Sequence, residues 1–274
     1  HYNKSKSKAE SLRKELEKNG TKIYLVKGDL SKETDINKIV KYAKSKLKYF
    51  DCLINNASLF ENDKLDNFFK YDFDLFNGIN VTIPFKSKVV KFLDVIDDEA
   101  KILGNINCIS KSDDMIYGFN TDKYGFDMLL KKNNIIIDGS SCIILGAGSS
   151  AKTVVKCLID QGIHKIVIKN RSLDNALSLQ NFIHSLGFKN TELYNNNIVS
   201  CDIAINTTPI GMYNEDIDNF FNIPVAENTS LIDLIYSSKE TLFLKKFDKC
   251  SQKVNGLDMF IYQALKSIEI WRET

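Results

Sequence analysis

Residues 142–151 read Cys-Ile-Ile-Leu-Gly-Ala-Gly-Ser-Ser-Ala, a short apolar run followed by the pattern G-x-G-x-x-A. The apolar run predicts a buried strand, and the spacing of apolar residues after it predicts a helix that ends near Gly162. Gly146 permits a tight turn, Gly148 lets the backbone approach a pyrophosphate, and the small Ala151 lets helix and strand pack closely. The stretch therefore predicts a Rossmann-type dinucleotide-binding unit with the phosphates at the helix N-terminus.

The next predicted strand ends at Lys169 and is followed by Asn170, Arg171 and Ser172. A carboxylate at this position would bind a free ribose 2′-hydroxyl, whereas a guanidinium binds a phosphate through two hydrogen bonds. Basic residues in this chain are overwhelmingly lysine, so an arginine here stands out. We therefore expect NADP rather than NAD, with Arg171 on the 2′-phosphate. The alternative is a solvated arginine at a strand end.

Strands and helices alternate along most of the chain, which predicts parallel sheets covered by helices. The tail over 241–271 predicts two amphipathic helices, broken at Asn255-Gly256, that return to cover the first half. The other segments predicted from periodicity are helices over 5–19, 35–47 and 87–93 and strands over 21–26, 52–54, 79–85, 165–168, 202–206 and 231–235.

Composition narrows the class of protein. The 274 residues are 43% hydrophobic, enough for a substantial core, and a net charge of +2 with 26% charged residues does not indicate a nucleic-acid binder. The first twenty residues are charged, and no apolar run approaches the roughly 18 residues of a membrane span. The six cysteines form no C-x-x-C pair and do not cluster with the three histidines. We expect a cytoplasmic monomer or homodimer with a small-molecule substrate and no metal, nucleic acid or membrane partner.

A lysine and an aspartate are candidates for proton chemistry. Lys86 ends the run Asn-Val-Thr-Ile-Pro-Phe-Lys, where α/β proteins place their sites, and Asp122 follows Asn120 and Thr121. Reduction of a carbonyl requires one group that delivers a proton to the developing alkoxide and another that holds the reacting oxygen. The alternative for Lys86 alone is a solvated surface lysine, since lysines are abundant here.

From Asn80 to the C-terminus the sequence resembles the shikimate dehydrogenase family, with motif after motif in order. Besides the glycine loop and Asn170-Arg171-Ser172, the motifs are Asn80-Val81-Thr82-Ile83-Pro84-Phe85-Lys86, Gly104-Asn105-Ile106-Asn107, Gly118-Phe119-Asn120-Thr121-Asp122, Asn206-Thr207-Thr208-Pro209-Ile210-Gly211-Met212, Asp233-Leu234-Ile235-Tyr236 and Asn255-Gly256-Leu257-Asp258-Met259 through Gln263. Two positions depart from the family: Lys123 stands where glycine usually follows Asn-Thr-Asp, and Asp258 replaces the glycine of Gly-Leu-Gly-Met.

The resemblance implies a role for each matching residue. Lys86 and Asp122 would be the catalytic pair. The residues implied to meet the substrate's hydroxyls are Thr82, Asn107, Tyr236 and Gln263. Those implied to line the cofactor NADP are Asp98, Gly146, Ala147, Gly148, Ser149, Ser150, Asn170, Arg171, Ser172, Leu173, Asp174, Asn175, Leu234 and Gly256.

Residues 1–79 do not follow that family, because the serine-rich turn expected to bind the substrate carboxylate is missing. They resemble the middle of a short-chain dehydrogenase/reductase of the pteridine-reductase kind. The motifs are His1-Tyr2-Asn3 with the following helix, Gly28-Asp29-Leu30-Ser31, and Phe50 through Ser58 with Asn55-Asn56-Ala57-Ser58. The glycine loop and the Tyr-x-x-x-Lys pair of that family are not found. We therefore hypothesise that two sequences join across residues 79–85.

The fold class expected is α/β with two domains: a chimeric N-terminal catalytic domain with a parallel sheet, and a C-terminal Rossmann-type NADP-binding domain. The expected divisions are 1–79, the short-chain-reductase-like segment; 80–130, the rest of the catalytic domain; 131–238, the NADP-binding domain; and 239–274, the returning helices. The resemblance implies NADP-dependent reduction of 3-dehydroshikimate to shikimate in aromatic amino acid biosynthesis. The alternatives are a catalytically impaired NADP-binding remnant or fusion and, ranked lowest, a short-chain reductase acting on a pterin.

Overall fold

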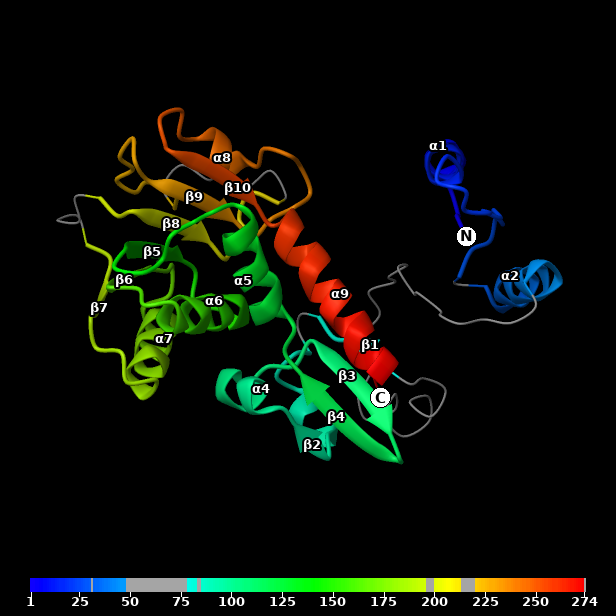
Figure 1. Cartoon of the computed structure of the whole chain (residues 1–274), viewed down its shortest axis with the longest axis horizontal. Coiled ribbons are helices and arrows are strands. Elements are labelled where there is room, and N and C mark those ends of the chain that lie inside the picture. Colours follow the sequence, from blue (N-terminus) through cyan, green and yellow to red (C-terminus); the bar gives the residue numbers. More distant parts are fainter. Residues whose placement is uncertain (31, 48–77, 83–84, 196–199, 213–219, 274) are drawn as a thin grey trace. The chain divides into compact units, whose positions relative to one another are not determined.

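The structure is a computed structural model, and it describes residues 1–30, 32–47, 78–82, 85–195, 200–212 and 220–273. The chain divides into two compact units, residues 1–64 and residues 65–274, which are treated separately below. Figure 1 shows the elements of both units.

The described part of the first unit, residues 1–30 and 32–47, contains two helices, α1 (Lys6–Glu17) and α2 (Glu33–Lys46), which confirm the helices expected there. The strand expected over 21–26 is wrong: no strand is assigned to these residues, and in the described part of this unit the next residue, Lys27, forms an isolated parallel bridge with Tyr2. A strand needs a continuous ladder of backbone hydrogen bonds. The strand expected over 52–54 lies outside the described residues.

The second unit begins with a four-stranded sheet of order β1-β3-β4-β2. Its strands are β1 (Gly78–Asn80), β2 (Val95–Ile96), β3 (Cys108–Ser112) and β4 (Met115–Phe119). Among the strands that the structure describes here, only β2 and β4 pair in parallel, so this part of the sheet is mixed where a parallel one was expected. The reason is the turn at Asp113 and Asp114, whose left-handed φ angles of 48° and 62° fold β4 back antiparallel to β3.

Two short helical segments accompany this sheet. They are the 3-10 helix η3 (Val89–Phe92) and the helix α4 (Asp98–Leu103). The segment over 87–93 was expected to be helical, and η3 forms its central part. Ala100 of α4 is buried in the same small core as Ile106 and Ile109, so α4 belongs to the four-stranded sheet. The sheet, η3 and α4 are called the small lobe below.

A six-stranded sheet of order β10-β9-β8-β5-β6-β7 forms the rest of the unit, and all its pairs are parallel. The strands are β5 (Ser141–Leu145), β6 (Lys165–Lys169), β7 (Thr191–Leu193), β8 (Ile203–Asn206), β9 (Ser230–Asp233) and β10 (Gln252–Asn255). Leu145 is in register with both Lys169 and Asn206, and Asp233 with both Asn206 and Asn255. The carboxyl ends of five strands therefore meet at one edge, which confirms the expected Rossmann-type arrangement.

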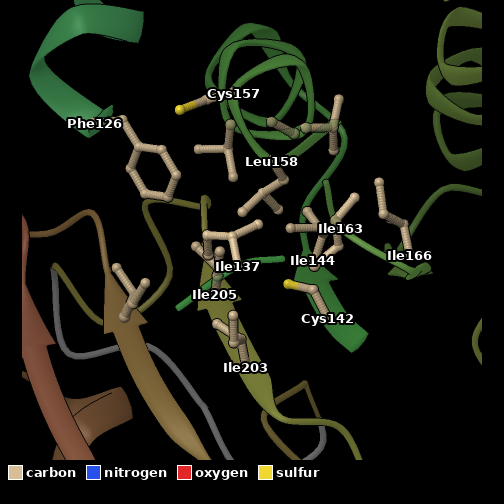
Figure 2. Close-up of a cluster of buried hydrophobic side chains, with 14 of the residues drawn as sticks. Phe126, Ile137, Cys142, Ile144, Cys157, Leu158, Ile163, Ile166, Ile203 and Ile205 are labelled. Atoms are coloured by element: carbon tan, nitrogen blue, oxygen red, sulfur yellow. The ribbon is translucent and has the colours of Figure 1, made fainter. Parts of the chain in front are cut away.

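Helices α5 (Asp122–Lys132), α6 (Ser149–Asp160), α7 (Leu173–Ser185) and α8 (Leu242–Lys245) lie in the same part of the chain. On one face of the six-stranded sheet, Phe126 of α5 and Leu158 of α6 pack with Ile144 and Ile205 in a buried cluster (Figure 2). Successive residues of a strand point to opposite faces, and Ile143 accordingly belongs to the cluster on the other face. The sheet is thus buried on both faces, as its apolar strands predict. The sheet with α6, α7 and α8 is called the large lobe.

The last helix, α9 (Leu257–Glu273), begins directly after β10 and packs on α5 and β3 (Figure 1). Near its end, the indole of Trp271 donates to the carbonyl of Ile109 over 2.9 Å. The end of α9 thus packs against the four-stranded sheet. The tail was expected to consist of two helices, and this is corrected because the strand β10 lies between α8 and α9. Val254 is the single aliphatic residue of β10, so the sequence of this strand carries no strand pattern. In the described ranges, no helix is long and apolar enough to cross a membrane.

Candidate functional site

Lys86 and Asp122, 36 positions apart, form an ion pair between Nζ and Oδ2. Lys86 lies in the turn after β1, where its carbonyl accepts from the N–H of Ile106 over 2.8 Å. Asp122 is the first residue of α5. The two side chains are 16% and 13% exposed, so the pair is shielded from water without being sealed from a ligand.

Asn107 and Gln263 complete the group. The side-chain amide of Asn107 donates to Oδ1 of Asp122 over 2.9 Å and lies 3.3 Å from Oε1 of Gln263. Its carbonyl oxygen accepts from the backbone N–H of Thr121 over 2.7 Å, which fixes the orientation of the amide. Four side chains singled out from the sequence are therefore in contact, although they come from the turn after β1, the segment before β3, α5 and α9. These four residues, Lys86, Asn107, Asp122 and Gln263, are called the polar cluster below.

Three further polar side chains support the polar cluster and were not singled out from the sequence. Ser267 accepts from Asn80 over 3.1 Å and lies 3.1 Å from the hydroxyl of Thr121. Ser267 and Thr121 are buried, so their hydroxyls are shielded from water, whereas Asn80 is exposed. The sequence could have indicated Ser267, because it lies four residues after Gln263 and thus on the same face of the predicted helix.

The glycine loop lies at the carboxyl edge of the six-stranded sheet. Gly146 has a φ of +108°, and a Cβ there would lie 2.6 Å from the hydroxyl of Thr207. Gly148 caps α6 without a side-chain hydrogen bond to the first turn. The first N–H groups of a helix can then bind an anion. The loop, with Ala147, Ser149 and Ser150, has the geometry expected of a pyrophosphate site.

The expected 2′-phosphate segment follows β6, the neighbour of β5 in the sheet. Arg171 is exposed there, and Ser172 caps α7 by accepting from the N–H of Asn175 over 3.4 Å. Asn170 donates to the carbonyl of Ser172 over 2.8 Å and thereby holds the turn. Leu173 and Asp174 are exposed in the first turn of α7, so the whole segment is open to a ligand.

Leu234 and Gly256 meet at the same edge of the sheet. The N–H of Gly256 donates to Ile235 over 3.1 Å, and its Cα lies so close to the carbonyl of Leu234 that a side chain could not be added. Nearby, the ring of the exposed Tyr236 stacks on Phe260 with 4.5 Å between centroids. At 1.5 Å per residue, Gln263 lies about 10 Å along α9 from Gly256. The helix α9 thus runs from the carboxyl edge of the six-stranded sheet to the polar cluster.

Two predicted residues do not join the others. Thr82 is exposed, and its carbonyl accepts from the N–H of Phe85 over 2.9 Å. Asp98 is at the start of α4 with a side chain that is 95% exposed and lies 3.1 Å from Lys101.

A buried carboxylate lies at the carboxyl end of β9. Asp233 ends β9 and is fully buried, and it accepts from Asn206 over 3.0 Å, from the N–H of Ile235 over 3.1 Å and from the hydroxyl of Thr241 over 2.5 Å. Burial raises the pKa of Asp233 to about 6, although these hydrogen bonds act in the opposite direction.

The two departures from the family motifs both form ion pairs. Asp258 lies 2.7 Å from Lys132, which ties the start of α9 to the end of α5. Lys123 lies 2.9 Å from Glu99 and 2.7 Å from Asp160. Both side chains are thus accommodated by a charged partner.

Two protein families match different parts of this chain. Residues 129–223 match the shikimate / quinate 5-dehydrogenase family, and residues 1–106 match the short chain dehydrogenase family. The second match extends beyond residue 79, so the division between 79 and 80 stays a prediction.

Three relatives are similar to this chain over most of its length. The shikimate dehydrogenase (NADP(+)) of Clostridium beijerinckii is 42% identical over 205 residues, 72% of each chain. A crystal structure of a shikimate dehydrogenase in complex with NADP+ has a TM-score of 0.69 at 32% identity, over 77% of this chain and 78% of that one. The shikimate 5-dehydrogenase from Listeria monocytogenes, in complex with shikimate and NAD, has a TM-score of 0.66 at 25% identity over 76% of each chain. These findings confirm the resemblance read from the motifs, and the chain belongs to the shikimate dehydrogenase family.

Proposed function

We propose that this protein catalyses the NADP-dependent reduction of 3-dehydroshikimate to shikimate. The observation that carries the proposal is the polar cluster, in which Lys86 and Asp122 face each other and Asn107 and Gln263 lie alongside. The named relatives are NADP-dependent shikimate dehydrogenases, which agrees with the proposal.

In this reaction NADPH, when bound, supplies the hydride to the substrate's carbonyl carbon. Lys86 delivers a proton to the oxygen as negative charge develops on it, and Asp122 holds the ammonium in place. Asn107 and Gln263 offer amide groups to the neighbouring hydroxyls, and Thr82 and Tyr236 meet others. A hydroxyl-rich ring needs several such directional donors and acceptors, which the polar cluster offers.

The cofactor is held at the carboxyl edge of the large lobe. The N-terminus of α6 and the backbone of the glycine loop bind the pyrophosphate, and Arg171 binds the 2′-phosphate. Gly256 and Leu234 line the path toward the nicotinamide end, and the exposed Asp98 of the small lobe would contribute only if it turned toward the bound cofactor. We propose a cytoplasmic monomer or homodimer whose small-molecule substrate is a cyclohexene carboxylate.

A second candidate is an NADP-binding protein without turnover. The observation in its favour is that residues 1–106 match a different family, so the usual partners of the substrate carboxylate are not supplied by a shikimate dehydrogenase sequence. The chain matches 72% of the length of its curated relative. This candidate shares the cofactor site and differs only in the substrate site.

One experiment separates the two candidates. The purified chain is titrated with NADP+ by calorimetry, and shikimate oxidation, the reverse reaction, is then followed by absorbance of the reduced nicotinamide. Lys86→Met is compared with Lys88→Met, which alters an exposed lysine two residues away. Turnover that is lost only in Lys86→Met supports the dehydrogenase. Binding without turnover supports the second candidate, and no binding overturns the assignment of the cofactor site.

A further inference from the structure

Four charged side chains from three helices form a closed cluster beside Asp122. Lys123 of α5 lies 2.9 Å from Glu99 of α4 and 2.7 Å from Asp160 of α6. Lys156 of α6 lies 3.3 Å from Glu99 and 2.6 Å from Asp160. Each cation thus contacts both anions, and the charges of the group sum to zero. Lys123, Glu99, Lys156 and Asp160 are called the charge cluster below.

The charge cluster links the two lobes. Ala100, next to Glu99, packs in the core of the small lobe, whereas Val154 and Leu158 of α6 pack in the core of the large lobe. The side chains of the charge cluster are between 14% and 37% exposed, so solvent screens them less than a surface pair. Burial alone would lower the pKa of Lys123, and its hydrogen bonds to Asp160 and Glu99 raise it, so the ammonium stays charged.

The position of Lys123 in the sequence gives the charge cluster a link to the chemistry. Lys123 follows Asp122 directly, in the first turn of α5. Any rotation of this turn moves the carboxylate that contacts Lys86. An error of about 1 Å in the placement of a reacting group can reduce a rate by about 100-fold.

We propose that Lys123 is a positioning residue: by clamping α4 of the small lobe to α6 of the large lobe, it holds Asp122 and Lys86 at a fixed separation from the glycine loop. The catalytic part of this inference rests on the proposed function, whereas the clamp itself is independent of it. Glycine, the residue usual at this position in the family, could not make the clamp.

The clamp can be tested without catalysis through a buried thiol. Cys157 is 2% exposed and lines a cavity of about 230 Å³ together with Glu99, Lys123 and Asp160. Burial raises the pKa of Cys157 to about 12, so the thiol reacts slowly unless this cavity, which residues of both lobes line, opens further. Alkylation by N-ethylmaleimide is measured residue by residue by mass spectrometry of peptides. Cys142, which lies in the core of the large lobe, reports global unfolding.

The decisive variant is Lys123→Met, because methionine fills the same space without the charge. We expect Cys157 to be alkylated at least tenfold faster in Lys123→Met, with Cys142 unchanged. Lys123→Arg should restore slow alkylation. The matched control is Lys165→Met, which removes a pair with Glu192 of 2.8 Å within the large lobe. High salt should accelerate alkylation of Cys157 in the unaltered chain, and by a smaller factor in Lys123→Met, where only Lys156 still contacts both Glu99 and Asp160.

Kinetics then test the positioning role. Lys123→Met should lower kcat at least tenfold and change the Kd for NADP+ less than twofold, while Lys165→Met changes neither. Unchanged alkylation of Cys157 in Lys123→Met overturns the clamp, and faster alkylation with unchanged kcat overturns the positioning role. Absence of turnover in the unaltered chain overturns the proposed function alone, because the alkylation rates judge the clamp without catalysis.

Discussion

Asn107 donates its side-chain amide to Oδ1 of Asp122 over 2.9 Å, while Lys86 contacts the other oxygen of the same carboxylate. Both oxygens of Asp122 are thus bound by donors from different segments, which gives the carboxylate one orientation. The orientation of Asn107 is itself fixed, because Thr121 donates to its carbonyl. Asn107 therefore fixes the geometry of the pair, in addition to the contact with a substrate that we propose for it.

Replacing Asn107 with aspartate should disrupt the ion pair with almost no change in volume. The new carboxylate oxygen would face Oδ1 of Asp122, and two like charges at this distance repel each other. We expect kcat/KM for shikimate to fall about 100-fold, because the loss of one hydrogen bond to a charged group has an effect of this size on a rate. Initial-rate kinetics check this. Asn133→Asp, which places a carboxylate beside Asp258 far along α5, is the matched control and should leave kcat/KM within twofold.

Two substitutions in the glycine loop should affect different properties, one the stability of the fold and the other the affinity for the cofactor. In Gly146→Ala the Cβ would press on Thr207 and the φ of +108° would be strained, so we expect the midpoint of thermal unfolding to fall by several degrees. In Gly148→Ala the Cβ meets no atom within 4 Å, so the fold should persist. The added methyl group would instead keep a pyrophosphate from the backbone, and we expect the Kd for NADP+ to rise about tenfold. Calorimetric titration and thermal unfolding of both variants decide this prediction, and equal behaviour of the two would contradict it.

Arg171 should determine the choice of cofactor. Its side chain is exposed at the carboxyl end of β6, and a guanidinium binds a phosphate dianion through two charged hydrogen bonds. In Arg171→Gln we expect the Kd for NADP+ to rise about 30-fold, and the Kd for NAD+, which has no 2′-phosphate, to stay within twofold. Arg13→Gln in the first unit is the control. A parallel loss of both cofactors would mean that Arg171 supports the fold of the turn rather than binding the phosphate.

The large lobe could be predicted from the sequence because its signals are local. The apolar run before Gly146 and the strand ending at Lys169 each carry their own pattern, and the structure confirms both. The strand β10 has no such pattern, because it is an edge strand whose pairing with β9 comes from the tertiary fold. The antiparallel pairing around Asp113 and Asp114 follows from left-handed backbone angles that aspartate tolerates, and the spacing of apolar residues does not reveal such angles.

The polar cluster could be predicted only in part. Lys86 and Asp122 were found because each belongs to a motif, and their contact agrees with the resemblance. Ser267 and Thr121 were missed, because a buried hydroxyl gains importance only when the fold places it against Asn80 or Gln263. Lys123 was noticed as a departure from a motif, but its partners on α4 and α6 are 24 and 37 positions away. Such a cluster of charges cannot be read from spacing along one helix.

Asp233 predicts an unusual dependence of stability on pH. Burial raises the pKa of Asp233 to about 6 in the folded protein, whereas the pKa in the unfolded chain is about 3.9. A raised folded pKa means that the folded state binds the proton more tightly. The contribution of Asp233 to stability is therefore fully present below pH 4 and is lost as the pH rises through 6. The decrease in the free energy of unfolding amounts to about 3 kcal/mol.

Asp233→Asn tests this dependence, because the amide keeps an oxygen for Asn206 and Ile235 and can donate to Thr241. The difference in free energy of unfolding between the unaltered chain and the variant, measured with urea between pH 4.5 and 7.5, should shift in favour of the variant as the pH rises. All other titrating groups cancel in that difference. Asp202→Asn is the control: hydrogen bonds from Ser141 lower the pKa of Asp202 below 3.8, so its difference should be flat over this range. A flat difference for Asp233→Asn as well would mean that the carboxyl is already ionised throughout, with its three donors outweighing burial.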